Sequence, residues 1–196
     1  MEKEAARLLA ALDDQGLLLQ HDRVLPSATA VIAGEPVAGS WWAHPMANPI
    51  YDALNELDDG GHLLRCKLVA GKVTLVAGRL WPALLAAVTE RGSWQVQGVG
   101  ASALDLLAAV DGASDPVLLD GTNRSDGRRL GERLLVHATD VHLPTGRHTK
   151  ALEPWRSVRE RTGVELRLSA AAGRAALEAV VDGWAAGRPL LPWSRR

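Results

Sequence analysis

Two stretches of the chain alternate between apolar and polar residues, which is the pattern of β-strands with one buried face. The first reads LLRCKLVAGKVTLVAGRLW and the second LLVHATDVHLPTGRHTKALEPW. Each contains a glycine turn signal, at residues 70–71 in the first stretch and 144–146 in the second. The pattern therefore predicts two β-hairpins.

Outside the hairpins, apolar residues recur every three to four positions, which favours amphipathic helices. Gly16 is a stop signal for the first helix, Asn48-Pro49 and Trp81-Pro82 are start signals, and Ser102 with Asp105 has the spacing of a capping box. The predicted helices cover residues 2–13, 48–59, 81–91, 102–110, 115–119, 126–134, 153–161 and 169–184.

The order of these elements indicates a fold. Residues 39–92 read helix, hairpin, helix, and residues 93–155 read as short helices followed by a hairpin, which is the order of a winged helix-turn-helix. We predict an α+β protein with two winged-helix-like units, 39–92 and 93–155. An N-terminal helix and connection occupy residues 1–38, and a helical C-terminal extension occupies residues 156–196.

Composition limits the function. The chain is 47% hydrophobic, enough for a core, and its 22 Lys and Arg nearly balance 23 Asp and Glu, for a net charge of −1. A protein that holds nucleic acid by bulk positive charge is excluded, so an anion-binding surface must be a local patch. The single cysteine, Cys66, forms no internal disulfide, and neither a signal peptide nor a bilayer-spanning run is evident. We expect a cytoplasmic protein that does not bind membranes.

The first hairpin has two different faces. A two-residue turn at 70–71 places Cys66 opposite Leu75 on an apolar face, where a buried, inert thiol is expected. The opposite face carries three cations, Arg65, Lys67 and Lys72. Such a face suits a wing on a phosphate backbone, and it equally suits a solvated hairpin edge that lysines protect from aggregation.

The second hairpin raises the question of a metal site. A turn about 145–146 pairs Leu143 with His148, so that His142 and His148 point to opposite faces and His137 lies far down the strand. We therefore predict surface or network histidines and no metal site. The remaining cations are candidates for phosphate contacts, with Arg147 and Lys150 near the hairpin tip and Arg128 and Arg129 on the preceding, recognition-like helix.

Several motifs carry a resemblance: GSWWAHP, KLVAGKVTLV followed by RLWPALL, the WQ pair, and the second hairpin. These blocks resemble a bacterial protein family without an assigned activity. The chain is also distantly similar to AlkZ-type DNA glycosylases, which are built from tandem winged helices. In those enzymes a Gln-x-Gln or Gln-x-Asp pair positions the hydrolytic water, which implies catalytic roles for Gln95 and Gln97.

Aromatic side chains are candidates for base stacking. Trp41, Trp42 and Trp94 have this capacity, although tryptophans beside helix starts are more often core residues. His44 lies between two tryptophans and a proline, which fits either a substrate or phosphate contact or a helix cap.

The sequence thus supports three hypotheses. The first is a protein that binds duplex DNA, undamaged or damaged, in repair or regulation. The second is an AlkZ-like glycosylase acting on alkylated bases, and the third is a scaffold that binds a protein partner. No cofactor is predicted.

Overall fold

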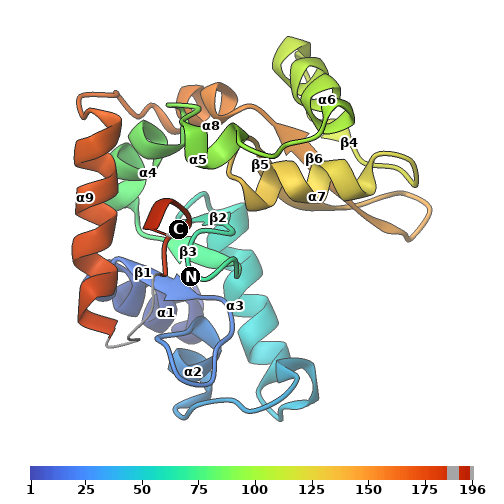
Figure 1. Cartoon of the computed structure of the whole chain (residues 1–196). Helices are drawn as coiled ribbons and strands as arrows, with labels where there is room; N and C mark the ends of the chain where they lie inside the picture. The colour runs from blue at the N-terminus through green and yellow to red at the C-terminus, as the bar shows by residue number, and fades with distance from the viewer. Residues whose placement is uncertain (185–189, 195–196) are drawn as a thin grey trace.

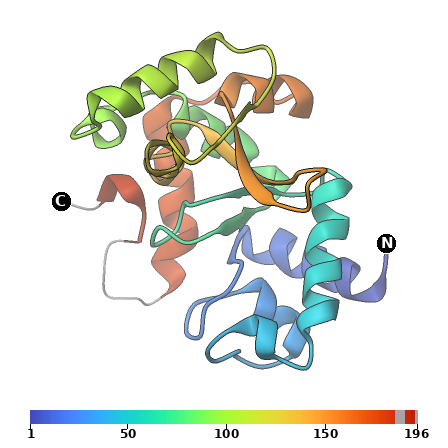
Figure 2. The same ribbon diagram turned by 90° about the vertical axis from the view of Figure 1, so that its right-hand side faces the viewer.

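The computed structural model describes residues 1–184 and 190–194, and within them it contains nine α-helices and two three-stranded antiparallel sheets (Figure 1). The predicted α+β class is confirmed. The two sheets lie in separate parts of the chain, and the second lies above the first in Figure 2.

The first sheet has the strand order β1-β3-β2. Its strands are β1 (Leu17–Leu19), β2 (Leu64–Cys66) and β3 (Thr74–Val76). On one face it packs against α1 (Lys3–Gln15), α2 (Ala28–Ala33) and α3 (Ala47–Asp59), and on the other against α4 (Trp81–Val88) and α9 (Ala170–Val181). We call residues 3–76, from α1 to β3, the first unit.

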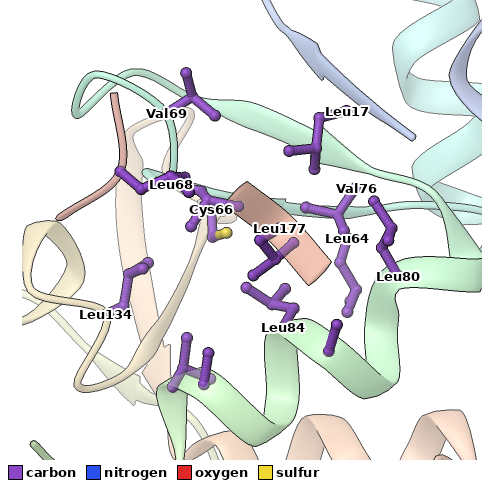
Figure 3. Close-up of a cluster of buried hydrophobic side chains, with 14 of the residues drawn as sticks. Leu17, Leu64, Cys66, Leu68, Val69, Val76, Leu80, Leu84, Leu134 and Leu177 are labelled. Atoms are coloured by element: carbon purple, nitrogen blue, oxygen red, sulfur yellow. The ribbon is translucent and has the colours of Figure 1, made fainter. Parts of the chain in front are cut away.

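Central strand β3 sends alternate side chains into the two halves of this core. Leu75 belongs to the cluster formed with α1, α2 and α3, and Val76 belongs to the cluster that includes Leu84 and Leu177 (Figure 3). Both side chains are fully buried. The solvent-facing side predicted for the first hairpin is therefore wrong in β3, where Thr74 and Val76 are buried, whereas its cations Arg65, Lys67 and Lys72 remain partly or fully exposed.

Helices α4 and α9 approach each other closely. A Cβ atom on Gly173 of α9 would lie 2.4 Å from the carbonyl oxygen of Ala83 in α4, so only glycine fits at this crossing. The segment predicted as a C-terminal extension thus completes the core of the first sheet.

The second sheet has the order β4-β6-β5 and is formed by β4 (Val117–Leu118), β5 (His137–His142) and β6 (His148–Glu153). Helices α6 (Ala101–Gly112) and α7 (Arg124–Glu132) share a third hydrophobic cluster with it. We call residues 101–153, from α6 to β6, the second unit. The helix predicted at 115–119 is wrong, because Val117 and Leu118 pair with β6 as a strand.

The predicted register of both hairpins is wrong by one residue. Cys66 pairs with Thr74, and His142 pairs with His148. In the second hairpin, the Leu143 N–H donates to the carbonyl oxygen of Arg147 around a three-residue loop, and the Leu143 carbonyl oxygen accepts from the N–H of Gly146, which has φ 80°. In the first, a tight turn does form at 70–71, but Thr74 Oγ1 accepts a hydrogen bond from the Val69 N–H and interrupts the ladder.

Helix ends follow their predicted signals in part. Gly16, at φ 82°, ends α1, and the Ser169 hydroxyl caps α9, as expected. The predicted roles of Asn48 and Ser102 are wrong: α3 begins one residue before Asn48, with Met46 at the cap position, and α6 begins after Gly100.

The remaining elements connect these layers. They are α5 (Ser93–Val96), α8 (Trp155–Thr162) and the short 3₁₀ turns Trp41–Ala43, Gly78–Leu80, Asp182–Trp184 and Pro192–Ser194. The predicted boundary at 38/39 cuts across the packing, because β1 belongs to the same sheet as β2 and β3. None of the helices in the described part of the chain is long and apolar enough to cross a membrane.

Candidate nucleic-acid interface

A cleft of about 790 Å³ lies between the first sheet and the second unit. Its walls come from β2, from α7, from the β5–β6 hairpin and from the end of α8. Four of the predicted phosphate-binding residues line it: Arg65, Lys67, Arg128 and Lys150. Arg124 and Arg161 line it as well, so cations that are far apart in the sequence converge here.

Most of these cations already have a carboxylate partner. Arg65 pairs with Asp58 at the end of α3, and Lys150 pairs across the hairpin with Asp140 at 2.7 Å between Nζ and Oδ2. The attraction for an added anion is lower than the number of cations suggests, because each carboxylate offsets the charge of its neighbour.

Glu132 is held by cations from both walls of the cleft. Its Oε1 accepts hydrogen bonds from Lys67 Nζ at 3.0 Å and from Arg128 Nε at 2.9 Å. The hydrogen bond from Arg128, opposed by partial burial and assisted by Lys67, lowers the pKa of Glu132 below its ordinary value. This carboxylate links α7 to the segment that follows β2.

Besides Arg128, three arginines of the second unit are exposed: Arg124, Arg129 and Arg147. Within residues 1–184 and 190–194, none of them lies within 4.0 Å of a carboxylate oxygen. Two of them belong to α7 and Arg147 to the hairpin tip, so the second unit presents cations that solvent reaches.

Lys72 does not join this group. It lies at the turn of the first hairpin and pairs with Asp22, with 2.7 Å between Nζ and Oδ2. Burial raises the pKa of Asp22, but hydrogen bonds from the Leu25 and Val24 amides and from Lys72 outweigh it and bring the pKa to about 2. The structure therefore places Lys72 in a local ion pair.

A buried polar network supports the cleft. Glu153 accepts hydrogen bonds from His137 Nδ1 at 2.8 Å and from both terminal nitrogens of Arg161 at 2.6 and 2.7 Å. Burial alone raises the pKa of Glu153, but these donors outweigh it and bring the pKa to about 2. His137 Nε2 lies 3.1 Å from the carbonyl oxygen of Arg65 in β2, so this network joins the second sheet to the edge of the first.

The predicted divergence of His142 and His148 is wrong. The observed register places them opposite each other, with 3.2 Å between Nδ1 and Nε2 and with ring centroids 4.5 Å apart. Both side chains are exposed. Within the described ranges, no three His, Cys, Asp or Glu side chains lie together so that they could hold a metal ion. His137, in contrast, is buried and hydrogen-bonded to Glu153.

The structure gives Gln95 a structural position. Its side chain is fully buried in helix α5, Nε2 donates to the carbonyl oxygens of Val88 and Leu134, each at 2.9 Å, and Oε1 accepts from the Gly92 amide. All of its polar atoms are engaged, so it has no free group to position a water. Gln97 is exposed and lies at the C-cap of α5.

The four stacking candidates lie outside the cleft. Trp41 is buried and stacks on Trp42, with centroids 3.9 Å apart. Trp42 is 61% exposed and lies beside Tyr51. Trp94 packs edge-on against Trp193, and His44 Nδ1 accepts the Met46 amide at the start of α3, which is the predicted cap role.

Cys66 is buried as expected. Burial raises the pKa of its thiol to about 12, which keeps it protonated at neutral pH and unreactive.

Sequence reasoning missed Glu132, Glu153 and Arg161. The spacing between Arg128 and Glu132 is a readable signal, since residues four apart on a helix are neighbours. Glu153 and Arg161 gave no such signal, because one ends a strand, the other lies in α8, and only the fold brings them together.

No protein-family model matches the chain, and comparisons with curated proteins and with solved structures found no match. The resemblance to AlkZ-type glycosylases stays a prediction. Function is therefore argued from the geometry of the described residues.

Proposed function

We propose that the protein binds duplex DNA through its second unit, with α7 as the recognition helix and the β5–β6 hairpin as the wing. The observation that carries this proposal is the charge of α7. This helix carries three exposed arginines, Arg124, Arg128 and Arg129, against two acidic residues, whereas α3, which precedes the hairpin in the first unit, carries four acidic residues and no Lys or Arg.

The order of elements supports the proposal. The first unit runs α1-β1-α2-α3-β2-β3, and the second runs α6-β4-α7-β5-β6. In both sheets the last strand lies between the other two. The first unit resembles a winged helix, in which the helix before the hairpin reads the major groove and the hairpin contacts the backbone. The second unit keeps the helix before the hairpin and the central last strand, but it has one helix, α7, where the first unit has two.

The charge and exposure of two arginines support them as contacts to DNA. Arg129 on α7 and Arg147 at the hairpin tip are exposed, and each offers a guanidinium to phosphate or to a base edge. Phosphate contacts of this kind make affinity fall with salt, by a slope of about −0.9 per neutralised phosphate.

Fluorescence anisotropy with a labelled duplex, across a salt series, tests the proposal. We expect the double variant Arg129→Gln/Arg147→Gln to bind about tenfold more weakly, with a slope shallower by about 2. The matched control, Lys3→Gln/Arg7→Gln, removes the same charge from α1, and we expect it to change affinity less than about twofold. No binding by the wild type at the lowest salt, or equal losses in both variants, contradicts the proposal.

The same experiment includes single-stranded DNA and a duplex with an alkylated base. Preferential binding of the alkylated duplex links the protein to repair. Release of the modified base by the wild type is the result that restores the glycosylase hypothesis, and Gln97→Ala then tests the residue that the resemblance implicates.

A second candidate function, binding of a protein partner, is favoured by the exposed aromatic pair Trp42 and Tyr51. Its test is affinity purification of the wild type beside the variant Trp42→Ser/Tyr51→Ser. A partner recovered only with the wild type shows that Trp42 and Tyr51 form its binding surface. Identical recoveries with both proteins contradict this second candidate function.

A further inference from the structure

Glu132 accepts hydrogen bonds from two cations, Lys67 and Arg128, that line the cleft. A single oxygen, Oε1, receives Lys67 from one wall and Arg128 from the other. A phosphate oxygen accepts charge-assisted hydrogen bonds from the same two donors with the same geometry. All three side chains are partly exposed, at 33% for Lys67, 39% for Glu132 and 73% for Arg128, so an external anion can reach them.

We propose that Glu132 is an internal competitor for phosphate: it occupies the position between Lys67 and Arg128 that a backbone phosphate takes when nucleic acid binds. This inference rests on the proposed function, because it assumes that phosphates reach α7. It adds that the free protein holds part of its phosphate-binding surface neutralised, and that binding exchanges one anion for another.

This exchange has two consequences for the free protein. Glu132 lowers affinity for any polyanion, because the contact with Lys67 and Arg128 must be lost before phosphate can replace it. It also ties α7 to the first unit, so its displacement releases α7 from the segment after β2.

The variant Glu132→Gln isolates the effect. The amide keeps the size of the side chain and an oxygen that accepts from Lys67 or Arg128, but it removes the charge. Its matched control is Glu35→Gln, which removes the same charge from an exposed residue that does not line the cleft. Thermal unfolding of each variant establishes that it is folded.

The probe is the labelled duplex across a salt series. We expect Glu132→Gln to bind about fivefold more tightly than the wild type. Its salt slope is expected to change by less than about 1, since a phosphate takes the same position between Lys67 and Arg128 in both proteins. Glu35→Gln is expected to change affinity less than about twofold, because the charge is distant and screened.

A second pair of variants separates local competition from a general charge effect. In a Lys67→Gln background, the gain from Glu132→Gln is expected to shrink, because one of the released donors is missing. An undiminished gain in that background overturns the inference.

The outcomes distinguish the two proposals. If the wild type binds duplex and Glu132→Gln binds no more tightly than Glu35→Gln, internal competition is overturned and the proposed function stands. Binding by the wild type, with tighter binding by Glu132→Gln than by Glu35→Gln, supports both. If no protein binds at the lowest salt, the proposed function fails, and the inference fails with it.

Discussion

The first and second units share a strand order and a helix before the hairpin, although the first unit has one helix more, and they use these elements differently. In both, a helix precedes a hairpin, and the last strand lies at the centre of a three-stranded sheet. The first sheet is covered on both faces by helices, whereas the outer end of the second hairpin, with Asp140 and His142, remains exposed. The same topology thus serves as a core element in one unit and as an accessible surface in the other.

Charge follows the same division. Helix α3 carries four acidic residues, and its Asp58 pairs with Arg65, whereas α7 carries three exposed arginines against two acidic residues. Topology alone does not define function, and the chemistry of the exposed helix distinguishes the two units. This contrast explains how a chain with a net charge of −1 can present a local basic surface.

The largest expected effect comes from the central strands. Leu75→Ala removes a fully buried side chain from β3, and we expect it to lower the free energy of unfolding by about 3 to 4 kcal/mol. Val141→Ala, in the half-buried part of β5, is expected to cost less than about 1 kcal/mol. Urea denaturation measures both, and similar losses contradict the difference in burial between the hairpins.

An intermediate effect is expected at Glu153, which joins the second hairpin to Arg161. Glu153→Gln is expected to cost about 2 kcal/mol at neutral pH, because it breaks charge-assisted hydrogen bonds in a buried network. Its pKa in the folded protein, about 2, lies below the ordinary value of 4.5. The ionised carboxylate therefore stabilises the fold above the ordinary value, and this contribution is lost as the pH falls toward 2.

Denaturation from pH 7 to pH 2.5 measures this dependence. The wild type loses stability in acid, and Glu153→Gln loses less. Asp22→Asn is the counterpart near the first hairpin, since the pKa of Asp22 is also about 2, and it too is expected to flatten the profile. A profile for Glu153→Gln parallel to that of the wild type removes Glu153 as a source of acid sensitivity.

The smallest effect is expected at the exposed end of the second hairpin. His142→Ala is expected to change stability by less than about 0.5 kcal/mol, because the ring is exposed and its hydrogen-bonding partner, His148, is exposed as well. A large loss, measured by the same denaturation, indicates that this end of the hairpin is structurally required.

The positions of the hairpins, the α+β class and most helices could be predicted because they depend on local periodicity and turn residues. Gly16, Ser169 and the glycines of both turns act within a few residues of themselves. The registers were wrong because a bulge or a three-residue loop shifts every pair by one, and alternation alone does not distinguish these loops from a two-residue turn. Because of this shift, His142 and His148 lie opposite each other on neighbouring strands.

The candidate site was predicted only in part, for a similar reason. The cations of α7 are visible as a local cluster, but the convergence of Lys67, Arg128 and Glu132 joins segments 65 residues apart. The buried role of Gln95 depends on carbonyl oxygens at Val88 and Leu134, which no spacing rule predicts.

By itself, the sequence determined the two hairpins, most of the helices, the buried thiol of Cys66 and the cluster of arginines on α7, because each depends on near neighbours or on side-chain chemistry. The tertiary structure decided which hairpin is covered, which cations are neutralised and which are accessible. These properties depend on packing between distant segments, such as α9 against α4 at Gly173, and on ion pairs such as that of Lys67 with Glu132. Burial and pairing depend on these long-range contacts, and the local pattern of residues does not record them.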